Sequence, residues 1–101
     1  AGSGVAGFVD GAGTAAQFKH PFGVAVDSAR TVYVADYNNH RIRKISPSGE
    51  VSTLAGSGVQ GFADGTGTAA RFNYPDGVAV DAEGNVYVAD MLNHRIRKIT
   101  Q

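Results

Sequence analysis

The stretch VYVADYNNHRIRKI at residues 32–45 recurs as VYVADMLNHRIRKI at residues 86–99. The two copies lie 54 positions apart, and the same shift aligns the rest of the chain with itself without a gap. Of the 47 residue pairs aligned in this way, 32 are identical. Sequence periods of about 20 to 50 residues are typical of solenoids, propellers and other repeat proteins. A period slightly above this range predicts one long loop in each repeat.

Within each copy, short apolar runs separated by short links predict the strands of an antiparallel meander. Val32-Tyr33-Val34-Ala35 is rich in the β-branched and aromatic residues that strands favour. Links of about four to six residues join neighbouring runs, as in consecutive hairpins. Val24-Ala25-Val26 is apolar on both faces, so we expect an inner strand that is covered on both sides. The expected strands are 22–27, 31–36, 41–46 and 51–55 in the first repeat, and 76–81, 85–90 and 95–100 in the second.

The long loop of each repeat is rich in glycine, and Asp64-Gly65-Thr66-Gly67 is a tight-turn signal. Thr14 and Thr68 each precede two alanines, which predicts one helical turn with threonine as its N-cap. Thr14 and Gln17 also have the spacing of a capping box. Four phenylalanines at equivalent places are expected to pin the loops over the sheet edges: Phe8, Phe18, Phe62 and Phe72.

Meanders repeated in tandem, with inner strands buried on both faces, predict a β-propeller. The runs PDGVAVD at 75–81, GNVYVAD at 84–90 and NHRI at 93–96 also resemble an NHL repeat, and the pattern covers nearly the whole chain twice. The resemblance implies a propeller, usually six-bladed, that serves as a binding platform, although a minority of the family are enzymes such as amidating lyases. The first copy departs from the pattern because Arg30 stands where the second has Gly84. If that turn has a positive φ, the arginine costs about 1 kcal/mol.

The chain is therefore expected to be all-β, with NHL repeat 1 at residues 1–54 and NHL repeat 2 at residues 55–101. Each repeat forms one four-stranded blade, and the second blade lacks its outer strand within these residues. Two blades do not close a ring, so each open flank exposes strands that are patterned for burial. A flank of about 500 Å² of apolar surface left in water forfeits roughly 12 kcal/mol, which exceeds the net stability of a typical small domain.

We therefore expect the chain to complete a propeller by self-association. A head-to-tail interface closes into a ring when its rotation divides the circle. Three chains would give six blades and four would give eight, and the family resemblance alone favours the homotrimer over the homotetramer. The oligomer interface is predicted at residues of the inner strands: Val24, Val26, Val78 and Val80.

One end of the meanders is expected to gather the long loops and the turns at residues 37–39 and 91–93. The two repeats differ in sequence there, and differences in exposed loops arise from ligand-specific contacts or from neutral drift. This loop face is the surface on which we expect a protein or a small ligand to bind. The candidate binding residues are Lys19, His20, Tyr37, Asn38, Asn73, Tyr74, Met91 and Leu92.

The composition argues against several classes of partner. Nine basic and nine acidic residues balance, so we expect neither nucleic acid nor an anionic membrane surface as a partner. The NHL resemblance implies RNA binding on the loop face in some relatives, but here the charge of that face is mixed. No apolar run approaches about 18 residues, so no transmembrane helix is predicted. The chain has no cysteine, which excludes disulfides and leaves the compartment open.

Repeated aspartates are the first candidates for chemistry. Asp36 and Asp90 are expected to cap the turns that follow them and to pair with arginine. Asp27 and Asp81 end the inner strands, and we expect local backbone hydrogen bonds there rather than a ring of cation ligands. The segment 10–13, Asp-Gly-Ala-Gly, lacks the oxygen ligands of a calcium loop.

The basic pairs Arg43-Lys44 and Arg97-Lys98 are interpreted as solvated charges that protect a sheet edge. The chain contains no phosphate loop, nucleophile elbow or paired metal ligands. We therefore expect no catalytic residues, no cofactor and no enzyme activity.

The alternative is a metal-dependent enzyme, similar to a lyase, with its site at the central channel between chains. His20 precedes Pro21 at the mouth of an inner strand, and Tyr74 takes its place in the second repeat. A trimer would therefore place three imidazoles around the axis, which is a ligand set of catalytic zinc. The resemblance to amidating lyases implies a metal in the channel, whereas the neighbouring Lys19 repels a cation.

Overall fold

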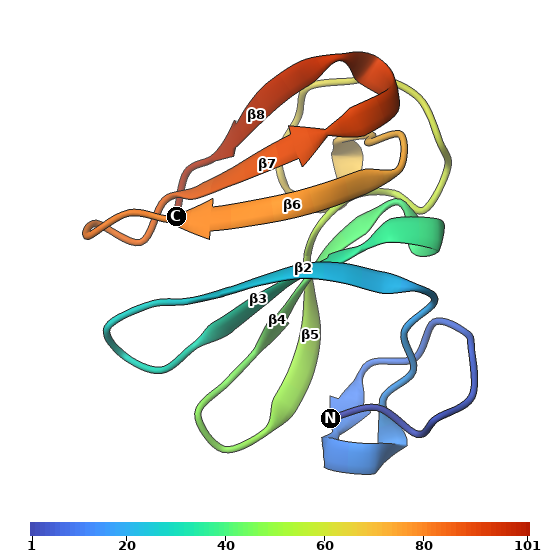
Figure 1. The fold of residues 1–101 in the computed structure, drawn as a ribbon, viewed down its shortest axis with the longest axis vertical. Helices are drawn as coiled ribbons and strands as arrows, with labels where there is room; N and C mark the ends of the chain where they lie inside the picture. Colours follow the sequence, from blue (N-terminus) through green and yellow to red (C-terminus); the bar gives the residue numbers. More distant parts are fainter.

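The computed structural model describes residues 1–101, which form eight β-strands in two sheets and four single turns of 3₁₀ helix (Figure 1). The first sheet has the strand order β1-β5-β4-β3-β2, and the second has the order β6-β7-β8. All neighbouring strands are antiparallel. The bounds are β1 Gly11–Ala12, η1 Gly13–Ala15, β2 Pro21–Val26, β3 Val32–Asp36, η2 Tyr37–Asn39, β4 Arg41–Ile45, β5 Glu50–Ala55, η3 Gly67–Ala69, β6 Pro75–Val80, β7 Val86–Asp90, η4 Met91–Asn93 and β8 Arg95–Ile99.

The two predicted meanders are confirmed, and each expected strand begins and ends within one residue of its observed bounds. We call the first sheet blade 1 and the second sheet blade 2. The short strand β1 was not expected. It pairs with β5 through Gly11 opposite Val51 and Ala12 opposite Glu50, so the long loop of repeat 1 adds a fifth strand at the outer edge of blade 1.

The inner strands β2 and β6 lie side by side in the middle of the molecule, with one blade on either side of them (Figure 1). Gly23 allows this close approach. A Cβ atom at Gly23 would lie 2.6 Å from the carbonyl oxygen of Asp76 and 3.0 Å from the Cα of Gly77, both of which belong to the backbone. Any side chain at this position would therefore push the two blades apart.

The hydrophobic core lies between the two blades. Blade 1 contributes one face of β3 and β4, and blade 2 contributes the opposite face of β6 and β7. The long loop that joins the blades fills the space between them with the buried side chain of Phe72. The core residues are Tyr33, Ala35, Ile42, Ala55, Ala70, Phe72, Val86 and Val88, with Leu54, Val78, Val80 and Ile99 packed against them.

The condition under which Arg30 is costly is met, because the turn after β2 has a positive φ at this residue. Its φ is 70°, and that of Gly84 at the equivalent position is 84°. The predicted threonine caps are wrong, because η1 begins at Gly13 and includes Thr14, and no side chain caps it. Gln17 instead forms a backbone bridge with Val9. No helix in the structure is long and apolar enough to cross a bilayer.

Candidate functional site

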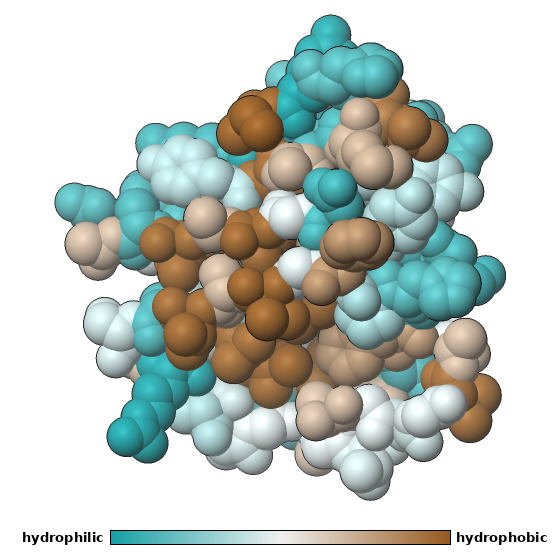
Figure 2. All heavy atoms as spheres, viewed as in Figure 1, coloured by the Kyte–Doolittle hydropathy of each residue, from teal (hydrophilic) through white to brown (hydrophobic).

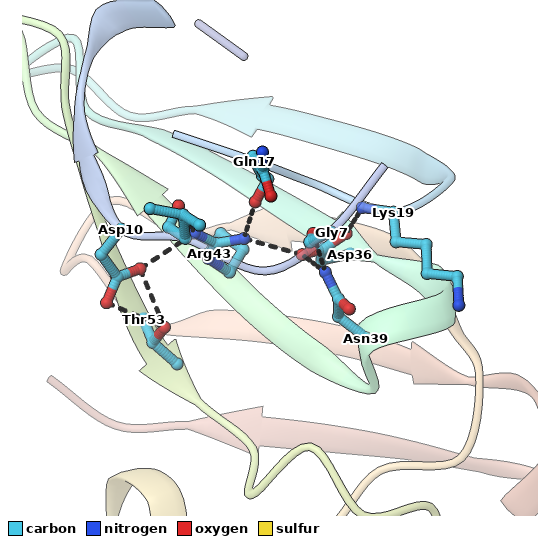
Figure 3. Close-up of polar contacts among 9 residues, drawn as sticks. Gly7, Asp10, Gln17, Lys19, Asp36, Asn39, Arg43 and Thr53 are labelled. Atoms are coloured by element: carbon cyan, nitrogen blue, oxygen red, sulfur yellow. Dashed lines mark hydrogen bonds and ion pairs between the residues drawn. The ribbon is translucent and has the colours of Figure 1, made fainter. Parts of the chain in front are cut away.

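The loop face of blade 1 is built around the buried carboxylate of Asp36 (Figure 3). Its Oδ1 accepts the backbone N–H of Lys19 at 2.8 Å. Its Oδ2 accepts Nδ2 of Asn39 at 2.7 Å and Nη1 of Arg43 at 2.8 Å. Asp36 therefore fixes the end of the long loop to the turn after β3, and the predicted pairing of this aspartate with an arginine is confirmed.

The guanidinium of Arg43 is fully buried, so its interpretation as a solvated charge is wrong. Its Nη1 also donates to the carbonyl of Gln17 at 2.8 Å. Its Nη2 donates to the carbonyl of Val9 at 2.9 Å and to the carboxylate of Asp10 at 2.9 Å. A buried charge is tolerated when it is paired and hydrogen-bonded in this way. Arg43 thus ties the long loop to β4 (Figure 3).

The phenylalanines of the long loop cover these arginines. The guanidinium of Arg41 lies 3.6 Å from the ring centroid of Phe8, and that of Arg43 lies 4.8 Å from the centroid of Phe18. Cation–π contacts of this kind are stronger when desolvated. The expected role of the phenylalanines as loop anchors is therefore consistent with the structure, which adds the arginines they contact. The same contacts recur in repeat 2 between Arg95, Arg97, Phe62 and Phe72.

Blade 2 repeats the polar network of blade 1. Asp90 accepts the backbone N–H of Asn73 at 2.8 Å, Nδ2 of Asn93 at 2.7 Å and Nη1 of Arg97 at 2.7 Å. Arg97 is also buried, which again contradicts the solvated interpretation, and its Nη2 donates to Asp64 at 2.9 Å. The two loop faces are therefore held by the same bonds, and their differences lie in the side chains that they display.

An aromatic cluster lies where the loop faces of the two blades meet. The ring centroids of Tyr37 and Tyr74 are 4.8 Å apart, and that of Phe22 is 5.7 Å from Tyr37. The ring of His40 meets Tyr74 edge-on at 4.5 Å, and its Nδ1 accepts the Tyr74 backbone N–H at 3.1 Å. Two of the predicted residues thus come together from different repeats. Phe22 and His40 were not among them, although Phe22 differs from Asp76 in the second repeat, which is the signal that selected the other candidates.

Four of the six remaining candidate residues form two separate hydrogen-bonded pairs. The carbonyl of Lys19 accepts the N–H of Asn38 at 3.0 Å, and the carbonyl of Asn73 accepts the N–H of Leu92 at 3.0 Å. Met91 and Leu92 are exposed on the turn of blade 2. The eight candidates are therefore distributed over both loop faces.

His20 is exposed and has a left-handed backbone, with a φ of 51°. It lines a shallow cavity with Phe18, Pro21 and the start of the chain. No group of three histidine, cysteine or carboxylate side chains within the chain is placed to hold a metal ion. A zinc site made by His20 would need several chains, and it stays a prediction.

Ionisable groups in the structure are shifted by local contacts. The backbone N–H of Thr31 lowers the pKa of Asp27, whose Oδ1 also accepts the N–H of Ala29 at 2.9 Å. Asp81 forms the same turn in blade 2, so the predicted local bonding of both aspartates is confirmed. Burial lowers the pKa of His40, and the nearby charge of Arg41 acts in the same direction.

Each blade has one face that points away from the other blade and is not covered, and we call this face its open flank. On blade 1, the side chains of Val24 and Val26 are 66% and 60% exposed, beside an apolar cavity that Val32, Val34 and Ile45 also line. Figure 2 shows apolar side chains gathered in the centre of the view, over β2 and the part of blade 1 below it in Figure 1. On blade 2, the open face carries Tyr87, Ala89 and Ile96, and Ile96 is 73% exposed.

The predicted interface residues fall into two groups. Val24 and Val26 are exposed on the open flank of blade 1, and their contact with another chain stays a prediction. Val78 and Val80 instead pack against the core between the blades, within the chain. The difference arises because blade 1 already covers the face of β6 that these two valines share.

Comparisons with known proteins agree with this architecture. The NHL repeat pattern matches residues 18–45 and 72–99, more than half of the chain. NHL repeat-containing protein 2 of Gallus gallus is 42% identical over 95 residues, which cover 90% of this chain and 13% of that protein. Protein SUPPRESSOR OF QUENCHING 1, chloroplastic, of Arabidopsis thaliana is 40% identical over 91 residues, which cover 89% of this chain and 9% of that protein.

Among solved structures, an auxiliary nutrient binding protein of Bacteroides thetaiotaomicron matches with a TM-score of 0.84 and 34% identity. The match covers 96% of this chain and 26% of that one. The chain thus spans about a tenth of the length of the curated relatives named above. The predicted fold, two blades of a β-propeller, is confirmed.

Proposed function

Because this chain belongs to the NHL repeat family, we propose that residues 1–101 act as a two-blade unit that associates head-to-tail into a closed propeller. The assembly serves as a non-enzymatic scaffold, and its loop face binds a protein or a small ligand. Three copies give six blades and four copies give eight, and six is the number usual in the family.

The observation that carries this proposal is that residues buried between the blades in one repeat have counterparts exposed on an open flank in the other. Tyr33, Ala35 and Ile42 of blade 1 are buried against blade 2, and their counterparts 54 residues later form the open flank of blade 2. Conversely, Val78 and Val80 are packed against blade 1, and their counterparts Val24 and Val26 are exposed on the other flank. The two flanks therefore carry the two halves of the interface that already exists inside the chain.

The backbone at the open flanks has the conformation that this interface uses. Within the chain, Tyr74 donates its N–H to His40, and their φ angles are 54° and 53°. Their counterparts are His20 and His94, and their φ angles of 51° and 55° are nearly the same. In a head-to-tail ring, His20 of one copy therefore meets His94 of the next without a change in backbone conformation. Such preorganisation lowers the entropic cost of association.

The polar groups of the loop face support a scaffold rather than an enzyme. Each buried aspartate, Asp36 and Asp90, accepts three hydrogen bonds from its own chain. Carboxylates occupied in this way hold loops and are poorly placed to exchange protons with a substrate. The aromatic rings of Phe22, Tyr37 and Tyr74 instead offer a surface for apolar or planar groups, which suits the binding role.

Light scattering on the purified chain tests the proposal, and we expect the mass of three chains at micromolar concentration. The variant Val24→Glu places a charge on the open flank of blade 1, where the present side chain is 66% exposed. We expect the ring to dissociate into single chains, because the charge is buried only when a second chain covers it. A wild-type chain that stays monomeric and well folded at this concentration would overturn the proposal.

A second variant tests the interface through its backbone. A Cβ atom at Gly77 meets only the side chain of Ala89, at an ordinary 3.6 Å, so Gly77→Ala should leave the single chain folded. In the ring, Gly77 packs against β2 of the next chain as Gly23 packs against β6 within the chain. A Cβ atom does not fit in this position. We therefore expect Gly77→Ala to weaken assembly without lowering the stability of the monomer, whereas the matched variant Gly23→Ala lowers the stability of the chain itself. An assembly of unchanged mass and affinity in Gly77→Ala would contradict the head-to-tail geometry.

A further inference from the structure

A groove of about 470 Å³ lies along the outer edge of β8. The segment 65–67 forms its other wall, and Ala70, Phe72 and Ile99 form its apolar floor. In blade 1 the equivalent space between β4 and β1 is filled by β5. The groove is therefore a strand-shaped space that blade 2 leaves open within residues 1–101.

Blade 1 shows how such a space holds a strand. On one side β5 pairs with β4, through Val51 opposite Ile45 and Thr53 opposite Arg43. On the other side it pairs with β1, and Gly13 donates its N–H to the carbonyl of Gly49 at 2.9 Å. The side chain of Val51 is buried, and the hydroxyl of Thr53 donates to Asp10 at 3.1 Å. The strand is thus held by both edges and by two side chains.

In blade 2 the groups that would make these contacts are present. Gly67, the counterpart of Gly13, lines the groove, and its N–H has no such carbonyl partner. Asp64, the counterpart of Asp10, is bound by Arg97 but receives no hydroxyl. Its side chain is 82% exposed, compared with 47% for that of Asp10. Blade 2 therefore repeats the donor and the acceptor of blade 1, namely the N–H of Gly67 and the carboxylate of Asp64. Each of them lacks one hydrogen-bond partner.

We propose that this groove binds an extended peptide strand with the residue pattern of β5. Such a strand carries an apolar residue where β5 has Val51 and a hydroxyl residue two positions later, where β5 has Thr53. The apolar side chain fills the floor beside Ile99, and the hydroxyl donates to Asp64. Backbone pairing with β8 on one side and with residues 65–67 on the other supplies the remaining contacts, as in other cases of strand addition. The site is independent of the open flanks, so it does not rest on ring formation.

The probe is the capped peptide SGEVSTLA, which has the sequence of residues 48–55. Isothermal titration calorimetry should show saturable binding of one peptide per chain, and amide NMR shifts should change in β8 and in residues 65–67. Replacing the valine of the peptide by glutamate should weaken binding by about tenfold or more, because the side chain enters an apolar floor. Replacing its threonine by valine should weaken binding by about fivefold through the lost hydrogen bond.

The protein variant Asp64→Ala completes the test, because alanine has no side-chain oxygen to accept the hydroxyl. It should weaken binding of the threonine peptide and remove the preference for it over the valine-substituted peptide, while Asp10→Ala, the matched change in blade 1, leaves that preference intact. Light scattering on the same samples reports assembly separately, so failure of the ring and failure of the groove are distinguishable. The proposal is overturned if no binding is seen at millimolar peptide, if the glutamate peptide binds equally well, or if Asp64→Ala keeps the preference for threonine.

Discussion

At the scale of single residues, the arrangement depends on charges that the chain buries and pairs. Arg43 has no exposed surface, and its guanidinium is bound by Asp36, by Asp10 and by two backbone carbonyls. A buried ion pair contributes little compared with apolar residues of the same volume, but removal of one partner leaves an uncompensated charge. The pair therefore acts mainly as a constraint that holds the long loop and the turn after β3 in one geometry.

The two aspartates that bind Arg43 allow a matched test. Asp36→Asn removes the fully buried partner and should lower the free energy of unfolding by about 3 to 5 kcal/mol. Asp10→Asn removes the partner whose side chain is 47% exposed, and the loss should be about 0 to 1 kcal/mol because water screens that pair. Urea unfolding monitored by circular dichroism gives both values. Equal losses in the two variants would show that burial does not set the contribution of this ion pair.

The sequence could not place this arginine, and the reason is physical. In RIRKI the charged residues flank an isoleucine, which is the pattern of a strand with one solvated face. Arg43 is buried because the long loop, which lies more than 20 residues earlier in the chain, folds back over that face of β4. The pairing of Asp36 with an arginine could be expected from turn chemistry, but its choice of Arg43 depends on this non-local contact.

At the scale of elements, local signals were sufficient for the strands of the meanders. Apolar runs punctuated by glycine, proline and aspartate predicted these strands to within one residue, because each run is delimited by its own turn residues. The strand β1 escaped prediction since its two residues extend only by pairing with β5, almost 40 positions later. The threonine caps were wrongly predicted because each 3₁₀ turn begins one residue before its threonine, at a glycine with positive φ, Gly13 or Gly67.

The junction between the blades gives a prediction about pH. His40 is buried there, its Nδ1 accepts the N–H of Tyr74, and burial holds its pKa below the usual 6.5. The charges of Arg41 and Lys19 act in the same direction, and Asp90 opposes them. The folded chain therefore binds this proton less readily than the unfolded chain does. The resulting stabilisation is present above about pH 6.5 and is lost as the pH falls toward the lowered pKa of the folded state.

Protonation of His40 should lower the free energy of unfolding by at most about 1.4 kcal/mol per pH unit over that interval. His40→Asn should reduce the fall, because asparagine tolerates the left-handed backbone and does not titrate. His20→Asn is the matched control, and both variants are made in the Val24→Glu chain, which is expected not to assemble, so that His20 keeps its exposed position and similar φ. Urea unfolding at pH 7.5 and pH 5.0, at one protein concentration, measures the difference. A slope that survives His40→Asn would assign the effect to another group.

At the scale of the whole molecule, the repeat predicts that each flank is complementary to the opposite flank and not to itself. The flank of blade 1 presents valines such as Val24, and the flank of blade 2 presents Tyr87 and Ile96. Inside the chain, residues equivalent to the first set pack on residues equivalent to the second. This asymmetry distinguishes a ring of heterologous contacts from a symmetric dimer, in which each flank would meet its own copy.

Mixing two blocked variants tests this polarity. Val24→Glu blocks the flank of blade 1, and Ile96→Glu blocks the flank of blade 2, where the present side chain is 73% exposed. Each variant alone should be a monomer, because its one free flank has no complement. An equimolar mixture should form a complex of one chain of each, held by the two free flanks, and it should grow no further because both outer flanks are charged. Sedimentation velocity resolves the monomer from this complex, and a sample of Val24→Glu at the total concentration of the mixture is the control. Dimers in either variant alone would indicate a symmetric contact, and a mixture that stays monomeric would show that the flanks do not associate.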